Sequence, residues 1–263
     1  MKKSSLYSLV LAMVVFACGP AKETKEETSQ EETTTEVTPE VVHNTLTDTE
    51  TADGWKLLFD GATTNGIRNF KKETLGKRWV VEDGTLHFQG KGEEAEGWQA
   101  EDGGDIIITD KEYENYELKL DWKVSKNGNS GIIYNVIESD NYDYVWQTGP
   151  EMQILDNEGH PDAQILKHKA GDLYDLIECD TIRVNPAEEW NSIRLVVNKG
   201  KVEHWLNGFK VVETEMWTDD WNAMVAGSKF KEMPAFGTGK KGHVSLQDHG
   251  DKVWFRNIKI REI

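Results

Sequence analysis

The chain has 263 residues, with 30 lysine and arginine side chains against 47 aspartate and glutamate side chains, which gives a formal net charge of -17. A chain this acidic argues against nucleic acid as a partner, because phosphates attract basic surfaces. Hydrophobic residues make up 37% of the sequence and include 10 tryptophans, so disorder along the whole chain is excluded.

The first 18 residues are typical of a signal peptide. Two lysines precede an apolar run at residues 6–16, which is too short to span a bilayer, and the run ends in Ala17, Cys18 and Gly19. A small residue before Cys and Gly is the pattern of a bacterial lipoprotein signal, in which Cys18 carries the lipid. An ordinary cleaved signal with an incidental cysteine is the alternative. We expect export to the bacterial cell envelope, periplasmic or outer-surface, with the lipid on Cys18 as the only membrane attachment.

Residues 19–53 are rich in Glu and Thr and hold almost no large apolar side chains. Such a composition cannot bury enough surface to fold. We therefore predict a disordered acidic tether at 19–53 and one folded domain at 54–263. Two cysteines cannot make a disulfide framework, and we expect Cys179 to be a buried small side chain rather than a nucleophile.

The folded part is predicted to be all-β, because short runs of Val, Ile, Leu, Trp and Tyr alternate with turns rich in Gly, Asn and Asp. This many strands suits two packed antiparallel sheets. The segment at 219–236 lacks periodicity and is predicted to cross the surface as a loop, with room for a short helical turn. The predicted strands are 55–60, 78–82, 85–88, 105–109, 116–124, 131–136, 151–155, 177–184, 192–198, 201–206, 209–213, 242–247 and 252–261.

Polar side chains at four places mark candidate site residues, since an unpaired polar group on a buried strand face costs roughly 1–3 kcal/mol. Strand alternation puts Glu151 and Gln153 on one face of the strand at 151–155. The other three places are the turn at 129–131, the stretch rich in titratable groups at 168–175, and the strand end at 246–250. Taken singly, each is explained as well by a solvent-facing side chain or a turn.

The spacing of carboxylates argues against standard glycosidase chemistry. Sandwich enzymes that hydrolyse β-glucans commonly place carboxylates two apart on one strand, because retaining hydrolysis needs a nucleophile and an acid about 5 Å apart. The matching positions here are Glu151, Gln153 and Leu155, so the partner carboxylate is missing. Tryptophans such as Trp205 have ring faces that suit sugars, although core packing is the commoner role of Trp in a sandwich.

Eight motifs follow one another through the folded part: LLFDG at 57–61, WVVEDGTL at 79–86, NSGI at 129–132, PEMQILD at 150–156, AGDLY at 170–174, EWN at 189–191, HWLNG at 204–208, and LQDHG at 246–250 with FRNI at 255–258. In this order they resemble the 3-keto-disaccharide hydrolase domain family. The resemblance covers residues 55–263. It implies a concanavalin A-like jelly-roll fold and exported, often lipid-anchored proteins that act on glycosides oxidised at C3 of the sugar.

The chemistry implied by the resemblance fits the missing carboxylate. A ketone at C3 acidifies the proton on C2, so one base can abstract it and expel the group on C1 by β-elimination, after which water adds to the enone. Members of the family depend on a separate nicotinamide-linked sugar 3-dehydrogenase to make the ketone. No Gly-rich nucleotide loop is present in the sequence, so we expect no nucleotide cofactor in this chain.

On this reading the polar clusters receive roles as hypotheses. Glu151 or His168 is the general base, and His249 with Gln153 binds the ketone and hydroxyls. Asp248 orients the His249 imidazole. A divalent cation that assists the enolate is a further hypothesis, with Asp156 and Asp172 as its ligands. The remaining substrate-binding candidates are Asn129, Ser130, Tyr174, Trp205 and Gln247.

Two other functions stay open from the residues alone. A carbohydrate-binding module would display Trp rings on a rigid sandwich and bind sugar without turnover. A conventional glycoside hydrolase would cleave an unoxidised disaccharide. Matched 3-keto and unmodified glucosides separate these functions in one assay.

Overall fold

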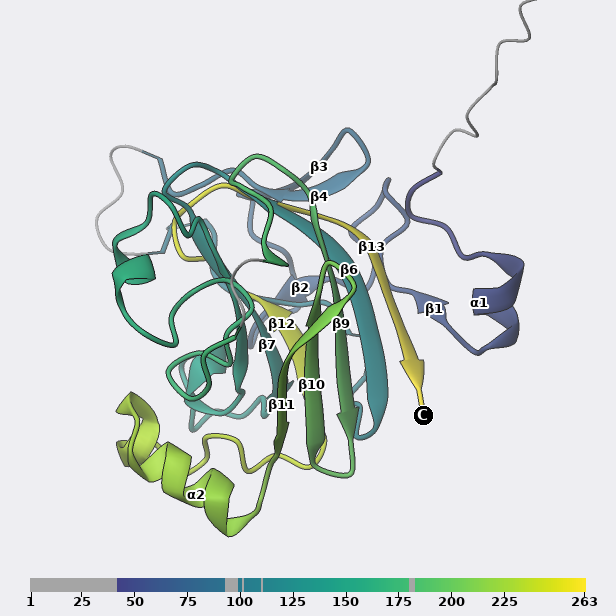
Figure 1. Cartoon of the computed structure of the whole chain (residues 1–263). Coiled ribbons are helices and arrows are strands. Elements are labelled where there is room, and N and C mark those ends of the chain that lie inside the picture. The colour runs from purple at the N-terminus through teal and green to yellow at the C-terminus, as the bar shows by residue number, and fades with distance from the viewer. Residues whose placement is uncertain (1–41, 93–98, 101, 110, 180–182) are drawn as a thin grey trace, which may run out of the picture. The chain divides into compact units, whose positions relative to one another are not determined.

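Two antiparallel β-sheets pack face to face in the computed structural model, and short helices lie outside them (Figure 1). The structure describes residues 42–92, 99–100, 102–109, 111–179 and 183–263. The predicted all-β sandwich of two antiparallel sheets, a concanavalin A-like jelly roll, is confirmed. Within the described residues, no helix is both long and apolar enough to cross a membrane.

The larger sheet runs in the order β11-β10-β9-β6-β13-β4-β3, and β1 pairs with β13. The smaller sheet runs in the order β2-β5-β12-β7-β8. The strands of the larger sheet are β1 (Lys56–Leu57), β3 (Trp79–Glu82), β4 (Thr85–Phe88), β6 (Tyr116–Val124), β9 (Asn191–Asn198), β10 (Lys201–Leu206), β11 (Phe209–Glu215) and β13 (Val253–Glu262). Those of the smaller sheet are β2 (Arg68–Asn69), β5 (Ile106–Ile107), β7 (Asn129–Val136), β8 (Glu151–Leu155) and β12 (His243–Leu246).

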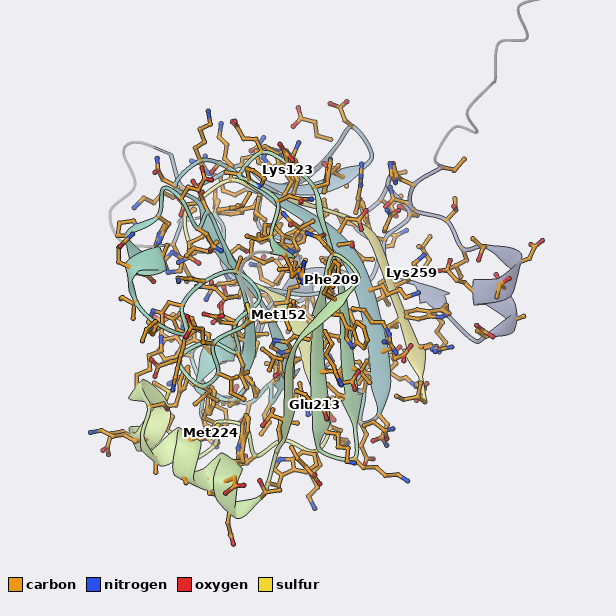
Figure 2. All side chains as sticks on the ribbon, viewed as in Figure 1. Lys123, Met152, Phe209, Glu213, Met224 and Lys259 are labelled. Atoms are coloured by element: carbon orange, nitrogen blue, oxygen red, sulfur yellow. The ribbon has the colours of Figure 1, made fainter. Side chains whose placement is uncertain are left out.

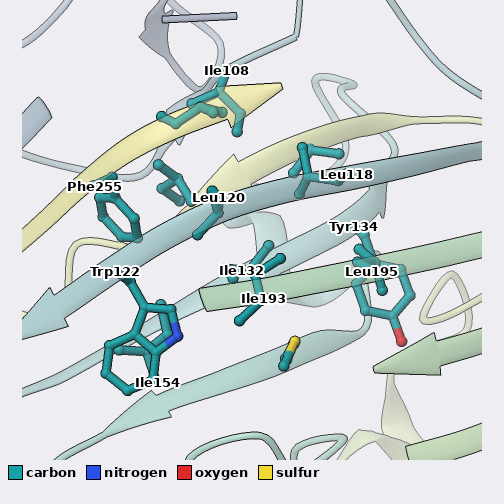
Figure 3. Packing of buried hydrophobic residues seen from close by; sticks show 14 of the residues in the cluster. Ile108, Leu118, Leu120, Trp122, Ile132, Tyr134, Ile154, Ile193, Leu195 and Phe255 are labelled. Atoms are coloured by element: carbon teal, nitrogen blue, oxygen red, sulfur yellow. The ribbon is translucent and has the colours of Figure 1, made fainter. Parts of the chain in front are cut away.

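The core lies between the sheets and is built by side chains that alternate inward along the strands. On β6 the inward residues Leu118, Leu120 and Trp122 are buried. Ile132 and Tyr134 of β7 meet them from the smaller sheet (Figure 3). Burying a large apolar side chain contributes roughly 1.5–3 kcal/mol to stability. The buried side chains therefore determine which face of each strand points into the core, and a site can form only on the opposite face.

Two predicted elements differ from the structure. The strand predicted at 177–184 is wrong over its first residues, because Ile177 forms only an isolated bridge with Leu173 in a tight turn. The segment predicted as a loop at 219–236 begins with the helix α2 (Asp219–Ala226), which the side chain of Thr218 caps. The described 3₁₀ helices are η1 (Val145–Gln147), η2 (Pro161–Gln164) and η4 (Lys229–Glu232).

The folded unit starts earlier than predicted. A helix, α1 (Asp48–Ala52), occupies the last residues of the predicted tether and lies beside β1 and β13 (Figure 1). Thr47 and Glu50 form a capping box. The Nζ of Lys259, a residue labelled in Figure 2, lies 2.6 Å from Glu50 Oε1. Asn44 is buried and exchanges hydrogen bonds with Asn257. The described residues before the predicted boundary at 54, residues 42–53, thus form part of the folded unit, since polar caps and an ion pair order this acidic segment.

The rest of the predicted tether, at 19–41, and the predicted signal peptide with Cys18 lie outside the described residues. Cys179 is buried, as predicted.

Candidate active site

The outer face of the smaller sheet carries a pocket of about 200 Å³. Strand alternation turns Met152 and Ile154 into the core and leaves Glu151 and Gln153 on this outer face. Six of the residues predicted to form the site line the pocket together: Asn129, Glu151, Gln153, Tyr174, Gln247 and His249. Trp146, Lys229 and Phe230 complete its lining.

Glycine makes room for the carboxylate at the pocket floor. Gly131 pairs with Gln153 across β7 and β8, and Glu151 pairs with Ile133. A Cβ atom at Gly131 would collide with Glu151 Oε1, so the carboxylate leans over the position where other residues carry a side chain. The motif at 129–132 therefore serves the site through the absence of a side chain.

Burial dominates the protonation of Glu151. Only 5% of the residue is exposed, and this burial raises the pKa of Glu151 to about 7. The charge of Asp162 raises that pKa further, whereas the ammonium of Lys229 opposes the rise. A carboxyl group with a pKa near neutrality can accept and return a proton under physiological conditions.

Lys229 brings a cation to the same pocket. Its Nζ lies 4.0 Å from the ring centroid of Tyr174 and 5.2 Å from that of Phe230. Burial lowers the pKa of Lys229, and the charge of Glu151 partly offsets this effect. Sequence reasoning missed Lys229 and Phe230, because both come from a segment without strand periodicity that tertiary packing alone brings to the sheet.

His168 does not line the pocket but contacts two residues that do. Its ring packs on Tyr174 at a centroid distance of 4.2 Å, and its Nε2 lies 3.1 Å from Asp175 Oδ1. Its backbone carbonyl accepts a hydrogen bond of 3.3 Å from Gln153 Nε2. The prediction of His168 as an alternative general base is therefore corrected: its ring contacts Tyr174 and its backbone carbonyl holds Gln153, two residues that do line the pocket.

Asp248 does not orient His249, which corrects a second prediction. Its buried carboxylate accepts hydrogen bonds from the backbone amides of Gly104 at 2.7 Å and Gly250 at 2.8 Å. Burial lowers the pKa of His249, and the charges of Asp251 and Asp162 oppose this shift, with Asp251 the larger of the two effects. Asp251 Oδ2 also accepts from the backbone amide of Asn129 at 3.1 Å, which holds these two parts of the lining together.

Asp156 and Asp172 are engaged by the backbone, which corrects their prediction as metal ligands. Asp156 Oδ2 accepts from the amide of Asn127 at 2.7 Å. Asp172 accepts from the amides of Lys169 and Cys179, each at 2.7 Å. Neither residue lines the pocket. The part of the chain that the structure describes holds no group of three or more His, Cys, Asp or Glu residues arranged to bind a metal ion.

Ser130 and Trp205 also lie away from the pocket. Ser130 is fully buried and donates to the carbonyl of Gln247 at 2.8 Å, so it ties β7 to the end of β12. Trp205 lies on the outer face of the larger sheet, where its Nε1 donates to Glu203 at 2.7 Å. Both predictions of substrate contact are corrected, because residue parity turns Ser130 inward and the Trp205 strand belongs to the other sheet.

Two lining residues hold buried oxygens without partners among the described residues. They are Asn129 Oδ1 and Gln247 Oε1, on residues that are 2% and 6% exposed. An orphaned buried acceptor costs about 1–3 kcal/mol. A ligand that donates hydroxyl groups would remove this cost, so the lining is suited to a polyhydroxylated molecule.

Comparison with known proteins shows which family the chain belongs to. Residues 54–261 match a family described as the 3-keto-alpha-glucoside-1,2-lyase-like domain. The chain belongs to this family. A 3-keto-disaccharide hydrolase of Bacteroides thetaiotaomicron is 39% identical over 233 residues, which cover 80% of this chain and 79% of that protein. The resemblance drawn from the eight motifs is therefore confirmed.

Solved structures agree with the family. A Parabacteroides distasonis protein, provisionally classed as a glycosyl hydrolase, is 34% identical with a TM-score of 0.75, and the match covers 84% of this chain and 100% of that one. A second protein of that class and organism is 26% identical with a TM-score of 0.58 over 80% of this chain and 99% of that one. The chain is a carbohydrate-active enzyme of the family.

Proposed function

We propose that this enzyme cleaves glycosides that are oxidised to a ketone at C3, including 3-keto-disaccharides. The observation that carries the proposal is a single buried carboxylate, Glu151, in a pocket whose described lining has no second acid and has Lys229 as its cation. Conventional glycoside hydrolysis needs two carboxyl groups that flank the bond. Elimination next to a ketone needs one base and a positive charge for the enolate oxygen. The name of the Bacteroides relative points to the same substrates.

In the proposed reaction Glu151 acts first as a base. Its carboxylate takes the proton from C2, and the C2–H electron pair forms a C2=C3 double bond while the ketone oxygen becomes an enolate oxygen. The enolate then expels the group on C1: the C1–O bond breaks, its electron pair leaves with the oxygen, and this oxygen takes the proton that Glu151 holds. The sugar is left as an enone.

Water completes the cycle. As water adds to C1 of the enone, Glu151 accepts a proton from the water and returns a proton to C2. The products are a 3-keto sugar and the free leaving group, and Glu151 regains its starting state. A pKa of about 7 suits a residue that alternates between both forms in this way.

The other lining groups bind and stabilise. The ammonium of Lys229 stabilises the enolate oxygen, an interaction that is stronger in the transition state than in the ground state. Trp146 and Phe230 offer aromatic surfaces to the apolar faces of a sugar ring. Gln153, which His168 steadies, lies on the pocket floor and hydrogen-bonds the sugar.

Paired substrates and one substitution test the proposal. We expect the wild-type enzyme to release product from a 3-keto-glucoside and not from the matched unoxidised glucoside. Glu151→Gln should lower kcat/KM by roughly 10²- to 10⁴-fold, whereas Glu114→Gln, at an exposed position, should leave it unchanged. Full activity of Glu151→Gln removes the proposed base. Binding without turnover would favour a carbohydrate-binding module, and cleavage of the unoxidised glucoside would favour a conventional hydrolase.

The cellular setting is part of the proposal. We place the enzyme in the bacterial cell envelope with a lipid on Cys18, supported by the apolar run and the Ala-Cys-Gly sequence of the N-terminus. A separate sugar 3-dehydrogenase would supply the ketone. Metabolic labelling with a radioactive fatty acid tests the anchor: the wild-type protein should take up label and Cys18→Ala should not, and equal labelling of both would refute lipidation at Cys18.

A further inference from the structure

The pocket has two chemically different ends, and the strand register sets them apart. Glu151 pairs with Ile133, and the backbone amide of Tyr174 donates to the carbonyl of Glu151 at 3.0 Å. The ammonium of Lys229 lies over the rings of Tyr174 and Phe230, so these groups gather at this level of the sheet. We name this the aromatic end; its residues are Tyr174, Lys229 and Phe230.

The opposite end is polar. The backbone amide of Gln247 donates to the carbonyl of Gly131, and two residues further along the antiparallel pair His249 reaches the level of Asn129. The contact of Asp251 with the Asn129 amide holds that level together. We name Asn129, Gln247 and His249 the polar end.

The carboxylate of Glu151 lies between the two ends. It occupies the space above Gly131, and Asn129 lies two residues along the same face of β7. At about 3.4 Å per residue, Asn129 is roughly 7 Å from that point. This distance leaves space for part of a ligand on the far side of the base from Lys229.

The order of atoms in the substrate then orients it, given the proposed function on which this step rests. The proton that Glu151 takes is on C2, whose two ring neighbours are C3 and C1. The enolate oxygen on C3 requires the positive charge, so C3 lies toward Lys229 and the aromatic end. C1 is on the other side of C2, so its leaving group points toward the polar end.

We propose that the polar end is the binding subsite for the leaving group, and that it selects a hydroxylated leaving group, a second sugar. The unpartnered oxygen of Asn129 requires a hydrogen-bond donor, which a sugar hydroxyl supplies and a small alkyl group does not. His249 provides a further polar contact at the same level.

Two substrates with the same 3-keto-glucosyl part and different leaving groups test this assignment. One is a 3-keto-disaccharide, and the other is methyl 3-keto-glucoside. Asn129→Leu removes the acceptor at similar volume. It should lower kcat/KM for the disaccharide roughly 2- to 10-fold, the range of a neutral hydrogen bond, and leave the methyl glycoside unchanged. Asn129→Ser should give the same selective loss if the leucine variant does not fold.

Ser245→Ala is the matched control. Its Oγ is another buried oxygen without a partner in the described part of the chain, but it lies outside the pocket lining. Both substrates should be cleaved at wild-type rates by this variant. Equal losses for both substrates in the Asn129 variants, or no loss for either, would overturn the subsite. If the wild-type enzyme cleaves neither substrate, the proposed function itself has failed.

Discussion

The buried carboxyl group of Glu151 should make the stability of this protein depend on pH in a way that one substitution removes. The folded state raises the pKa of Glu151 from its ordinary 4.5 to about 7, so the folded protein binds a proton more tightly than the unfolded chain does. Stability from this group is fully present below pH 4.5 and is lost as pH rises through about 7. At 1.36 kcal/mol for each pH unit, the loss amounts to about 3 kcal/mol.

Glu151→Gln keeps the size of the side chain and removes its titration. We expect the free energy of unfolding of the variant, relative to the wild type, to rise by about 3 kcal/mol between pH 4 and pH 8. Urea denaturation followed by tryptophan fluorescence at several pH values measures this difference, and other titrating groups cancel in it. Glu114→Gln, at an exposed site, controls for the change of charge. A difference that stays constant across this range would refute the reasoning that burial sets the pKa of Glu151.

Three further substitutions address the site. Gly131→Ala should abolish most activity because its Cβ would displace the Glu151 carboxylate, whereas Gly227→Ala, where a Cβ has ordinary contacts, should keep it; steady-state rates decide. Lys229→Met should lower kcat roughly 10²- to 10³-fold and move the acid limb of kcat/KM to higher pH, since the ammonium lowers the pKa of Glu151; an unshifted limb would contradict this. Asp175→Ala should move the same limb in the same direction by loosening the helical turn of Lys229, and an unchanged pH profile would exclude this role.

Much of the fold could be predicted from the alternation of side chains. The strands at 116–124, 151–155 and 201–206 have the predicted bounds, because each buries one face against the core or pairs through a tight turn. The strands β2 and β5 have two residues each, which is too short for any periodicity. The helix α2 was missed because its sequence has no apolar stripe at helical spacing. Its start is stabilised instead by the side chain of Thr218, which caps the helix.

The difference between strands with regular alternation and segments without it also explains which site residues were predicted. Glu151 and Gln153 were predicted because strand parity alone decides which face they occupy, whereas Asn129 was predicted as a small hydrogen-bonding residue of an expected turn. Parity gives no information about segments that fold back over a sheet, so Lys229 and Phe230 were missed. It also fails for polar residues in turns: Asp156 and Asp172 have the composition of metal ligands, and only the structure reveals that backbone amides occupy their oxygens.

The stretch at 168–175 holds the backbone of Lys229, the residue that carries the cation of the pocket. Asp175 has a left-handed backbone conformation with φ of 61°, and its two carboxylate oxygens contact two different segments. Oδ1 lies 3.1 Å from His168 Nε2, and Oδ2 accepts the backbone amide of Lys229 at 2.7 Å. One side chain thus joins the turn that supports Tyr174 to the helical turn that carries the ammonium. The ammonium that lowers the pKa of Glu151 is therefore on a turn that is held by Asp175, a residue outside the pocket lining. The titratable groups that marked this stretch as catalytic thus position the segments around the pocket.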